Sequence, residues 1–181
     1  DYGLPSGLAK PVYGIERFIG FPGIAGNDED LDHGFNLYPA RGRPHLGGKT
    51  LLFMVDGLYG CVNVGSTVND ANARWRNLFA GQWSASYFLS LDPVALDSVA
   101  VDFLRSEFGN SLGGGASRNC DNYLHEAALA HSPPSGTVYR PDGTNRLASL
   151  GVHEHWNDSL RKQYSRNLGT GAGIELVPVH A

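Results

Sequence analysis

The chain has 181 residues, of which 41% are hydrophobic and 18% are charged, and its formal net charge is −4. These values are typical of a globular domain with a hydrophobic core. They argue against a nucleic-acid-binding protein, which normally carries a basic face. The sequence holds no apolar run of about 18 residues, so it predicts no membrane span. Its 24 glycines predict a backbone rich in loops.

Residues 1–49 contain many prolines and glycines and show little periodicity. An acidic cluster, Asp28 to Asp32, lacks the ligand spacing of a calcium-binding loop and is best explained as a solvated loop. We therefore expect an irregular amino-terminal arm, attached to an α/β core over residues 50–181 of the same single domain. A stretch this long without structure of its own is unusual, so a partner segment upstream could be missing.

The first apolar run, Thr50 to Val55, predicts a strand buried on both faces. Asp56 ends this strand, at the position where α/β proteins place ligand-binding groups, so it is a candidate catalytic residue. A simple turn carboxylate is the alternative. Residues 70–82 then predict a helix, and Trp83 beside it is either a packing residue or a platform for a ligand.

Residues 86–109 give the clearest structural pattern, a short aromatic strand that leads into a helix over residues 93–108. Asp92 suits the N-cap, Pro93 the first turn and Gly109 the end of this helix. Asp97 lies in an apolar row of the helix. A carboxylate there must find a partner, so Asp97 is either structural or part of a catalytic site.

A second helix is predicted from Asp121 to about residue 131. His125 and Glu126 on it are candidate binding residues. Neighbouring helical residues point about 100° apart, so these two should not act as a pair on one face. The only cysteines, Cys61 and Cys120, lack C-x-x-C spacing and could be free thiols or one disulfide.

The segment His153-Glu154-His155-Trp156 follows a predicted extended stretch. In an extended chain His153 and His155 share one side, which is how a strand presents two imidazoles to a divalent metal ion. A hydrogen-bonded polar cluster is the alternative. Four other residues are candidates for a third ligand: His45, Asp56, Asp97 and His125.

Near the carboxyl end, Tyr164 and Arg166 are candidates to stabilise negative charge that develops during a reaction. A last strand is predicted over residues 174–177. Together the patterns predict an α/β fold that is loop-rich and glycine-rich. We expect a mixed central sheet, with strands near 50–55, 86–91 and 174–177, and flanking helices near 70–82, 93–108 and 121–131.

Six ordered blocks between about Pro44 and Val177 resemble the family called domain of unknown function 362. They are HLGGKTLLFMVDGLYG, SYFLSLDPVALDSVAVDFL, DNYLHEAALA, PPSGTVY, SLGVHEHWND and QYSRNLG…GIELV. The resemblance implies a bacterial or archaeal protein, often secreted, and hence an extracellular or periplasmic location. Some members carry an added iron–sulfur domain, whose cysteine cluster this chain lacks. The chain looks like the carboxyl-terminal part of the family, so residues from a missing amino-terminal part could complete its site.

The leading hypothesis from these residues is a metal-assisted enzyme acting on a polar substrate such as a saccharide. His153 and His155 would hold the ion, and Asp56 or Asp97 would be a third ligand or a general base. A second hypothesis is a non-catalytic saccharide-binding or surface module that uses Trp75, Trp83, Trp156 and the tyrosines as stacking platforms. A third is a structural or assembly subunit that associates with itself.

Overall fold

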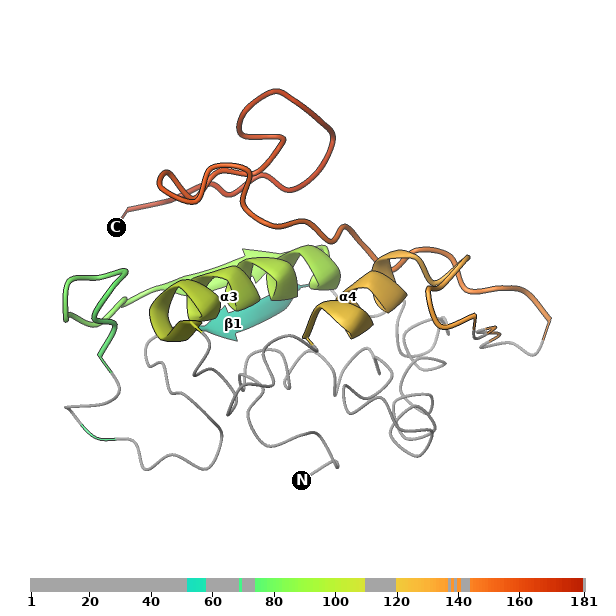
Figure 1. The fold of residues 1–181 in the computed structure, drawn as a ribbon, viewed down its shortest axis with the longest axis horizontal. Helices are drawn as coiled ribbons and strands as arrows, with labels where there is room; N and C mark the ends of the chain where they lie inside the picture. Colours follow the sequence, from blue (N-terminus) through green and yellow to red (C-terminus); the bar gives the residue numbers. More distant parts are fainter. Residues whose placement is uncertain are drawn as a thin grey trace.

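The computed structural model describes residues 52–57, 69, 74–109, 120–136, 138, 140 and 144–180. Two strands and two helices form its regular structure: β1 (Phe53–Asp56), β2 (Tyr87–Ser90), α3 (Pro93–Phe108) and α4 (Cys120–Ala128) (Figure 1). The strands and helices occur together, so the described part is a mixed α/β arrangement. Within this part, neither helix is long and apolar enough to cross a membrane.

Helix α3 forms the centre of the described structure. Asp92 caps it, because its Oδ1 accepts the N–H of Ala95 at 2.9 Å, and Pro93 follows in the first turn. The helix ends at Gly109, whose φ of 55° suits glycine and whose N–H bonds to the carbonyl of Arg105. Most of its sixteen residues are buried, including polar ones, so α3 is covered on more than one side.

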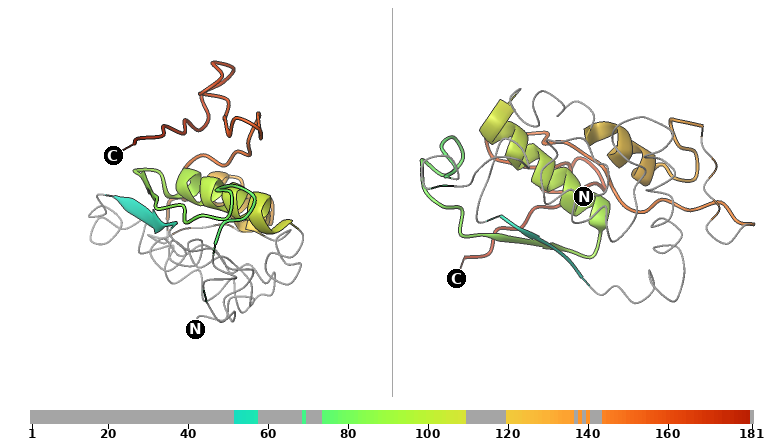
Figure 2. Two further views of the ribbon diagram at one scale, coloured as in Figure 1. Left: turned by 90° about the vertical axis from the view of Figure 1, so that its left-hand side faces the viewer. Right: turned by 90° about the horizontal axis from the view of Figure 1, so that it is seen from below.

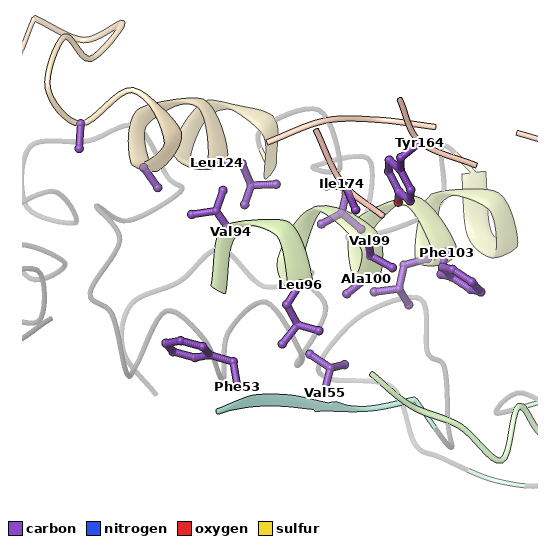
Figure 3. Close-up of a cluster of buried hydrophobic side chains, with 14 of the residues drawn as sticks. Phe53, Val55, Val94, Leu96, Val99, Ala100, Phe103, Leu124, Tyr164 and Ile174 are labelled. Atoms are coloured by element: carbon purple, nitrogen blue, oxygen red, sulfur yellow. The ribbon is translucent and has the colours of Figure 1, made fainter. Parts of the chain in front are cut away.

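The two strands cover one side of α3. They pair antiparallel, with Phe53 opposite Ser90 and Asp56 opposite Tyr87. Alternation along β1 turns Phe53 and Val55 inward, where they are buried near Leu96 (Figure 3). The β1–β2 sheet therefore lies behind α3 in the view of Figure 1, with one face in the core.

The carboxyl-terminal segment, residues 151–180, covers another side of α3. Its Tyr164 and Ile174 are buried in the same cluster as the residues of α3, on the side away from β1 (Figures 2 and 3). Since an isolated two-stranded sheet is only marginally stable in water, this second layer helps to hold α3 in place.

The structure confirms two of the predicted helices and corrects other predictions. The helix at 93–108 is confirmed, and the second helix ends at Ala128 rather than near 131. The predicted helix at 70–82 is wrong for residues 74–82, which form turns closed by a bridge between Trp75 and Gln82. The carboxylate of Glu107 accepts the backbone N–H groups of Asn77 and Leu78 at 3.0 and 3.1 Å, which replaces the bonds a helix would have made.

The predicted central mixed sheet is not found in the described residues, where β1 and β2 form a two-stranded antiparallel sheet. Residues 174–177 were predicted to be a strand of this sheet. They have no strand assignment. The N–H and C=O groups of Leu176 are bonded to the side-chain amide of Asn167 and not to a neighbouring strand. The expected arm at 1–49, with His45, lies outside the described residues, as does Cys61.

Candidate functional site: a histidine cluster beside helix α3

The segment that carries the two predicted histidines runs alongside α3. At its start the N–H of Val152 donates to Asp92 Oδ2 at 2.9 Å, and at its end the N–H of Trp156 donates to Asp102 Oδ2 at 3.1 Å. Ten residues of helix rise about 15 Å, and four residues of extended chain cover about 13 Å. The two lengths match, so the segment can be fixed to α3 at both ends.

Gly151 makes the first of these attachments possible. A Cβ at this position would lie only 1.9 Å from Oδ1 of Asp92. Any larger residue would therefore push the backbone away from the start of α3. Glycine is required here because the carboxylate approaches the main chain so closely.

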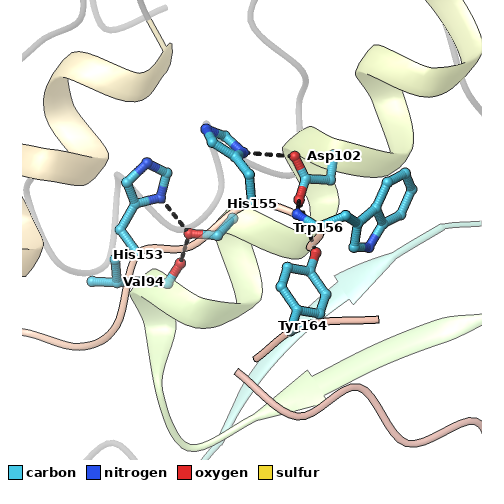
Figure 4. Close-up of polar contacts among 7 residues, drawn as sticks. Val94, Asp102, His153, His155, Trp156 and Tyr164 are labelled. Atoms are coloured by element: carbon cyan, nitrogen blue, oxygen red, sulfur yellow. Dashed lines mark hydrogen bonds and ion pairs between the residues drawn. The ribbon is translucent and has the colours of Figure 1, made fainter. Parts of the chain in front are cut away.

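His153 is oriented by Ser98, a fully buried residue of α3. The Ser98 hydroxyl donates its single hydrogen to the carbonyl of Val94 at 2.7 Å, and its Oγ lies 2.8 Å from Nδ1 of His153 (Figure 4). With its hydrogen already used, the hydroxyl can only accept from His153. Nδ1 of His153 therefore carries the proton, and in the neutral ring Nε2 carries the lone pair.

His155 is oriented in the same way by Asp102, one helical turn after Ser98. Its Nδ1 lies 2.7 Å from Oδ1 of Asp102. A carboxylate can only accept, so Nδ1 of His155 is protonated and Nε2 again carries the lone pair in the neutral ring. The His155 side chain is 41% exposed, so a solute can reach it.

Asp102 itself is held by three donors. Besides His155, its Oδ2 accepts the N–H of Trp156 at 3.1 Å and the hydroxyl of Tyr164 at 3.0 Å. Burial, and next the negative charge of Asp102, raise the pKa of Tyr164 above its ordinary value, so this phenol stays protonated and keeps donating. These three donors satisfy the oxygens of a carboxylate in a largely buried position.

The two imidazoles lie side by side, and a third joins them from α4. The ring centroids of His153 and His155 are 4.9 Å apart, and those of His125 and His153 are 4.4 Å apart, edge to face in both cases. Figure 4 shows that His153 and His155 each bond toward α3 through one nitrogen and turn the other nitrogen away from it. We call these three residues, His125, His153 and His155, the histidine cluster.

Glu154, between the two histidines, takes part in a different contact. Its carboxylate accepts the backbone N–H groups of Ser165 and Ile174, both at 2.8 Å, and the side-chain amide of Asn157. Partial burial raises the pKa of Glu154, but these hydrogen bonds outweigh burial and leave it below its ordinary value. Side chains alternate in direction along this segment, so His153 and His155 lie in the cluster while Glu154 points to the carboxyl-terminal loop.

The ability of the cluster to hold a metal ion depends on how many nitrogen or oxygen lone pairs it can direct at one point. Two Nε2 atoms with lone pairs, each on a ring fixed through Nδ1, form a common part of protein metal sites. Within the described residues, however, no group of three or more His, Cys, Asp or Glu side chains is placed to hold an ion. His153 and His155 would therefore need a further ligand or a movement of His125.

The other predicted catalytic residues occupy different environments. Asp97 is fully buried on α3, next to Ser98, whereas Asp56 is exposed at the end of β1. Tyr164 reaches the cluster only through Asp102. Arg166 is exposed, and its Nε lies 3.6 Å from the carboxylate of Glu175.

The predicted binding residues also separate. His125 is exposed and belongs to the cluster, whereas Glu126 is buried and accepts the N–H of Ser135 at 3.2 Å. Trp156 packs its ring edge to face with Phe103 at 5.2 Å. Trp83 has the guanidinium of Arg74 over its ring, 4.8 Å from the centroid.

Sequence reasoning missed the two residues that orient the histidines, Ser98 and Asp102. The signal was present, since they lie four residues apart, and hence on one side of the helix, among apolar residues such as Val94, Val101 and Phe103. Their partners lie more than fifty residues later in the chain, and only the tertiary structure shows which polar groups meet.

Comparison of the chain with models of protein families, with curated proteins and with solved structures gives no match.

Proposed function

We propose that the chain is an enzyme acting on a polar substrate and that the histidine cluster is its reaction centre. The observation that carries this proposal is the contact of His155 with Asp102. A half-exposed imidazole whose Nδ1 donates to a buried carboxylate has a defined tautomer and a fixed direction for its Nε2. Such a pair is suited to transfer protons.

In this reaction Nε2 of His155 takes a proton from a hydroxyl group of the substrate or from water. The imidazolium that forms is stabilised by the carboxylate of Asp102. The oxygen that has lost its proton then attacks an electrophilic centre, and the imidazolium returns the proton to the leaving group. Saccharides, which present many hydroxyl groups, are one substrate class with this chemistry.

The metal-assisted form of the proposal, expected from the H-x-H spacing, uses the same residues. A divalent ion on Nε2 of His153 and His155 would act as a Lewis acid toward the substrate. The finding that favours this form is that both Nδ1 atoms are already held, by Ser98 and Asp102, so that both Nε2 atoms present lone pairs.

Two measurements test the proposal. Elemental analysis of protein purified without a metal-affinity tag decides between the two forms: a near-stoichiometric divalent ion supports the metal-assisted form, and its absence rejects that form. Hydrolysis of chromogenic esters, phosphate esters and glycosides is then compared for the wild type and His155→Gln. We expect at least a 100-fold loss in the variant. The matched control is His131→Gln, an exposed histidine outside the cluster. Equal activity of wild type and His155→Gln would refute the proposal.

A non-catalytic saccharide-binding module is the second candidate, and it depends on the tryptophans. Trp156 is half-buried against Phe103, and Arg74 covers one face of Trp83, so both rings already have packing partners. This candidate predicts glycan binding that survives chelation and is lost in Trp156→Ala. Unchanged binding in that variant would count against it.

Membership of the family called domain of unknown function 362 remains a proposal, supported by the six sequence blocks. An extracellular or periplasmic location is proposed on the same resemblance. Detection of the native protein in culture medium or periplasmic extract, and its absence from the cytoplasm, would support that location.

A further inference from the structure

A groove of about 1290 Å³ lies between β2 and the carboxyl-terminal segment. One wall is the continuous stretch 84–90, which includes β2, and the opposite wall is the stretch 172–180, which we call the tail. The floor includes apolar side chains of α3 such as Val99 and Phe103. None of the residues of the histidine cluster lines this groove, so it is separate from the proposed reaction centre. We call it the β2–tail groove.

The wall formed by β2 is an open strand edge. β2 pairs with β1 on one edge, and the part of the chain that the structure describes supplies no strand for its other edge. On this wall Tyr87 and Leu89 are each 59% exposed, whereas Phe88 between them packs on Phe103. An open edge presents backbone N–H and C=O groups that can bind another extended chain.

The tail offers a second backbone edge beside the same groove. The N–H and C=O of Leu176 are both bonded to the side-chain amide of Asn167, at 3.0 Å each, and Ile174 uses its own N–H and C=O on Glu154 and Arg166. Successive peptide groups of an extended chain point to opposite sides. The N–H and C=O groups of Glu175 and Val177 therefore point away from these partners, and both residues line the groove.

The size and charge of the groove indicate the class of ligand. Small-molecule pockets are usually about 300–1,000 Å³, so this groove is larger than most of them. The wall at 84–90 would accommodate about 23 Å of extended chain. Three cationic side chains (Arg161, Lys162 and Arg166) and two acidic ones (Asp92 and Glu175) line it. Arg166 lies 3.6 Å from Glu175, and Arg161 lies 3.8 Å from Asp158. Lys162 is therefore the lining cation that no ion pair among the described residues balances, on a chain whose net charge is −4.

We propose that the β2–tail groove binds an extended, acidic polypeptide segment, which pairs as a strand with the open edge of β2 on one side and with Glu175 and Val177 on the other. Bound in this way, the segment would join β2 and the tail into one sheet. This would explain why residues 174–177 have the sequence pattern of a strand but no strand partner. Such strand addition uses main-chain hydrogen bonds for affinity and alternate side chains for specificity.

The test uses a fluorescein-labelled nonapeptide in which valine alternates with glutamate or threonine, and fluorescence anisotropy as the readout. We expect saturable binding to the wild type and at least tenfold weaker binding to Val177→Pro. This substitution removes the N–H that faces the groove, and it keeps Leu176 extended because a residue before proline favours that conformation. Circular dichroism checks that the variant is folded.

Three comparisons make the result specific. Lys162→Glu should weaken binding several-fold, whereas Arg140→Glu, outside the groove, should leave it unchanged. A peptide methylated on alternate backbone nitrogens should lose binding, since it cannot donate along one edge. In hydrogen exchange, the peptide should protect backbone amides within residues 87–90.

The proposal is overturned if the nonapeptide does not bind, or if Val177→Pro and the methylated peptide bind as well as their parents. It is also overturned if a neutral oligosaccharide, rather than the peptide, shows binding that depends on Lys162. That outcome would assign the groove to saccharides. Each of these results leaves the proposal for the histidine cluster intact.

Discussion

Replacement of Asp102 by asparagine tests the histidine cluster most directly. The carboxylate accepts three hydrogen bonds, from Nδ1 of His155 at 2.7 Å, from the N–H of Trp156 and from the hydroxyl of Tyr164. In Asp102→Asn, the amide oxygen can keep the last two donors in the place of Oδ2. The amide nitrogen then faces Nδ1 of His155, and two donors cannot pair. His155 must move its proton to Nε2, and the lone pair needed for proton transfer is lost.

The magnitude follows from the character of these bonds. A hydrogen bond to a charged group contributes about 1.5–3 kcal/mol and a neutral one about 1 kcal/mol. The variant loses the bond to His155 and weakens the other two bonds, which together lowers the free energy of unfolding by about 3–4 kcal/mol. Removal of a buried charge offsets part of this loss. We expect the free energy of unfolding to fall by about 3 kcal/mol, or Tm by about 10 °C for a chain of this size.

The assays are urea unfolding, ¹⁵N-detected NMR of the histidine tautomers and activity on any substrate that the wild type turns over. We expect Asp102→Asn to shift His155 from the Nδ1–H to the Nε2–H tautomer and to lower activity at least 100-fold. Tyr164→Phe is the matched control, because it removes one donor to Asp102 and keeps the ring. It should cost about 2 kcal/mol and leave the tautomer unchanged. An unchanged tautomer in Asp102→Asn, with stability within about 1 kcal/mol of wild type, would refute this reasoning.

Three further predictions concern the surroundings of the cluster. Ser98→Ala removes the acceptor of Nδ1 of His153 and should cost about 1–2 kcal/mol in urea unfolding, with both tautomers of that ring appearing in NMR; a single Nδ1–H tautomer would contradict it. Gly173→Ala places a Cβ 2.1 Å from Oε2 of Glu154 and should destabilise by about 1–3 kcal/mol, whereas Gly171→Ala, whose closest contact is 3.2 Å, should change less; equal effects would argue against the close packing at Gly173. The pKa of Glu154 in the folded protein is below its ordinary value of 4.5. Glu154 therefore raises the free energy of unfolding above pH 4.5, and this contribution is lost as the pH falls through the folded pKa. Glu154→Gln should therefore lower the unfolding free energy at neutral pH and flatten its decrease in acid, and a variant with the acid dependence of the wild type would disprove this role.

Much of α3 could be predicted from local sequence. Asp92, Pro93 and Gly109 act through their own backbone and that of the next few residues, so the ends of the helix are local properties. The alternation of His153 and His155 is local as well, and their rings lie side by side in the structure. The predicted helix at 70–82 was wrong over residues 74–82 because Glu107, about thirty residues away, bonds the backbone of that stretch and favours turns.

The local sequence predicts the start and end of α3, most of the strand at 53–56 and the common side of the two histidines, since each depends on residues close together in the chain. The expectation that this strand is buried on both faces is wrong, because Met54 is 62% exposed on the face turned away from α3. Tertiary contacts alone set Ser98 and Asp102 as the partners of these histidines and Asn167 as the partner of the Leu176 backbone. Those outcomes depend on hydrogen bonds between residues that are separated in sequence, and which buried polar groups meet is set by the packing around α3.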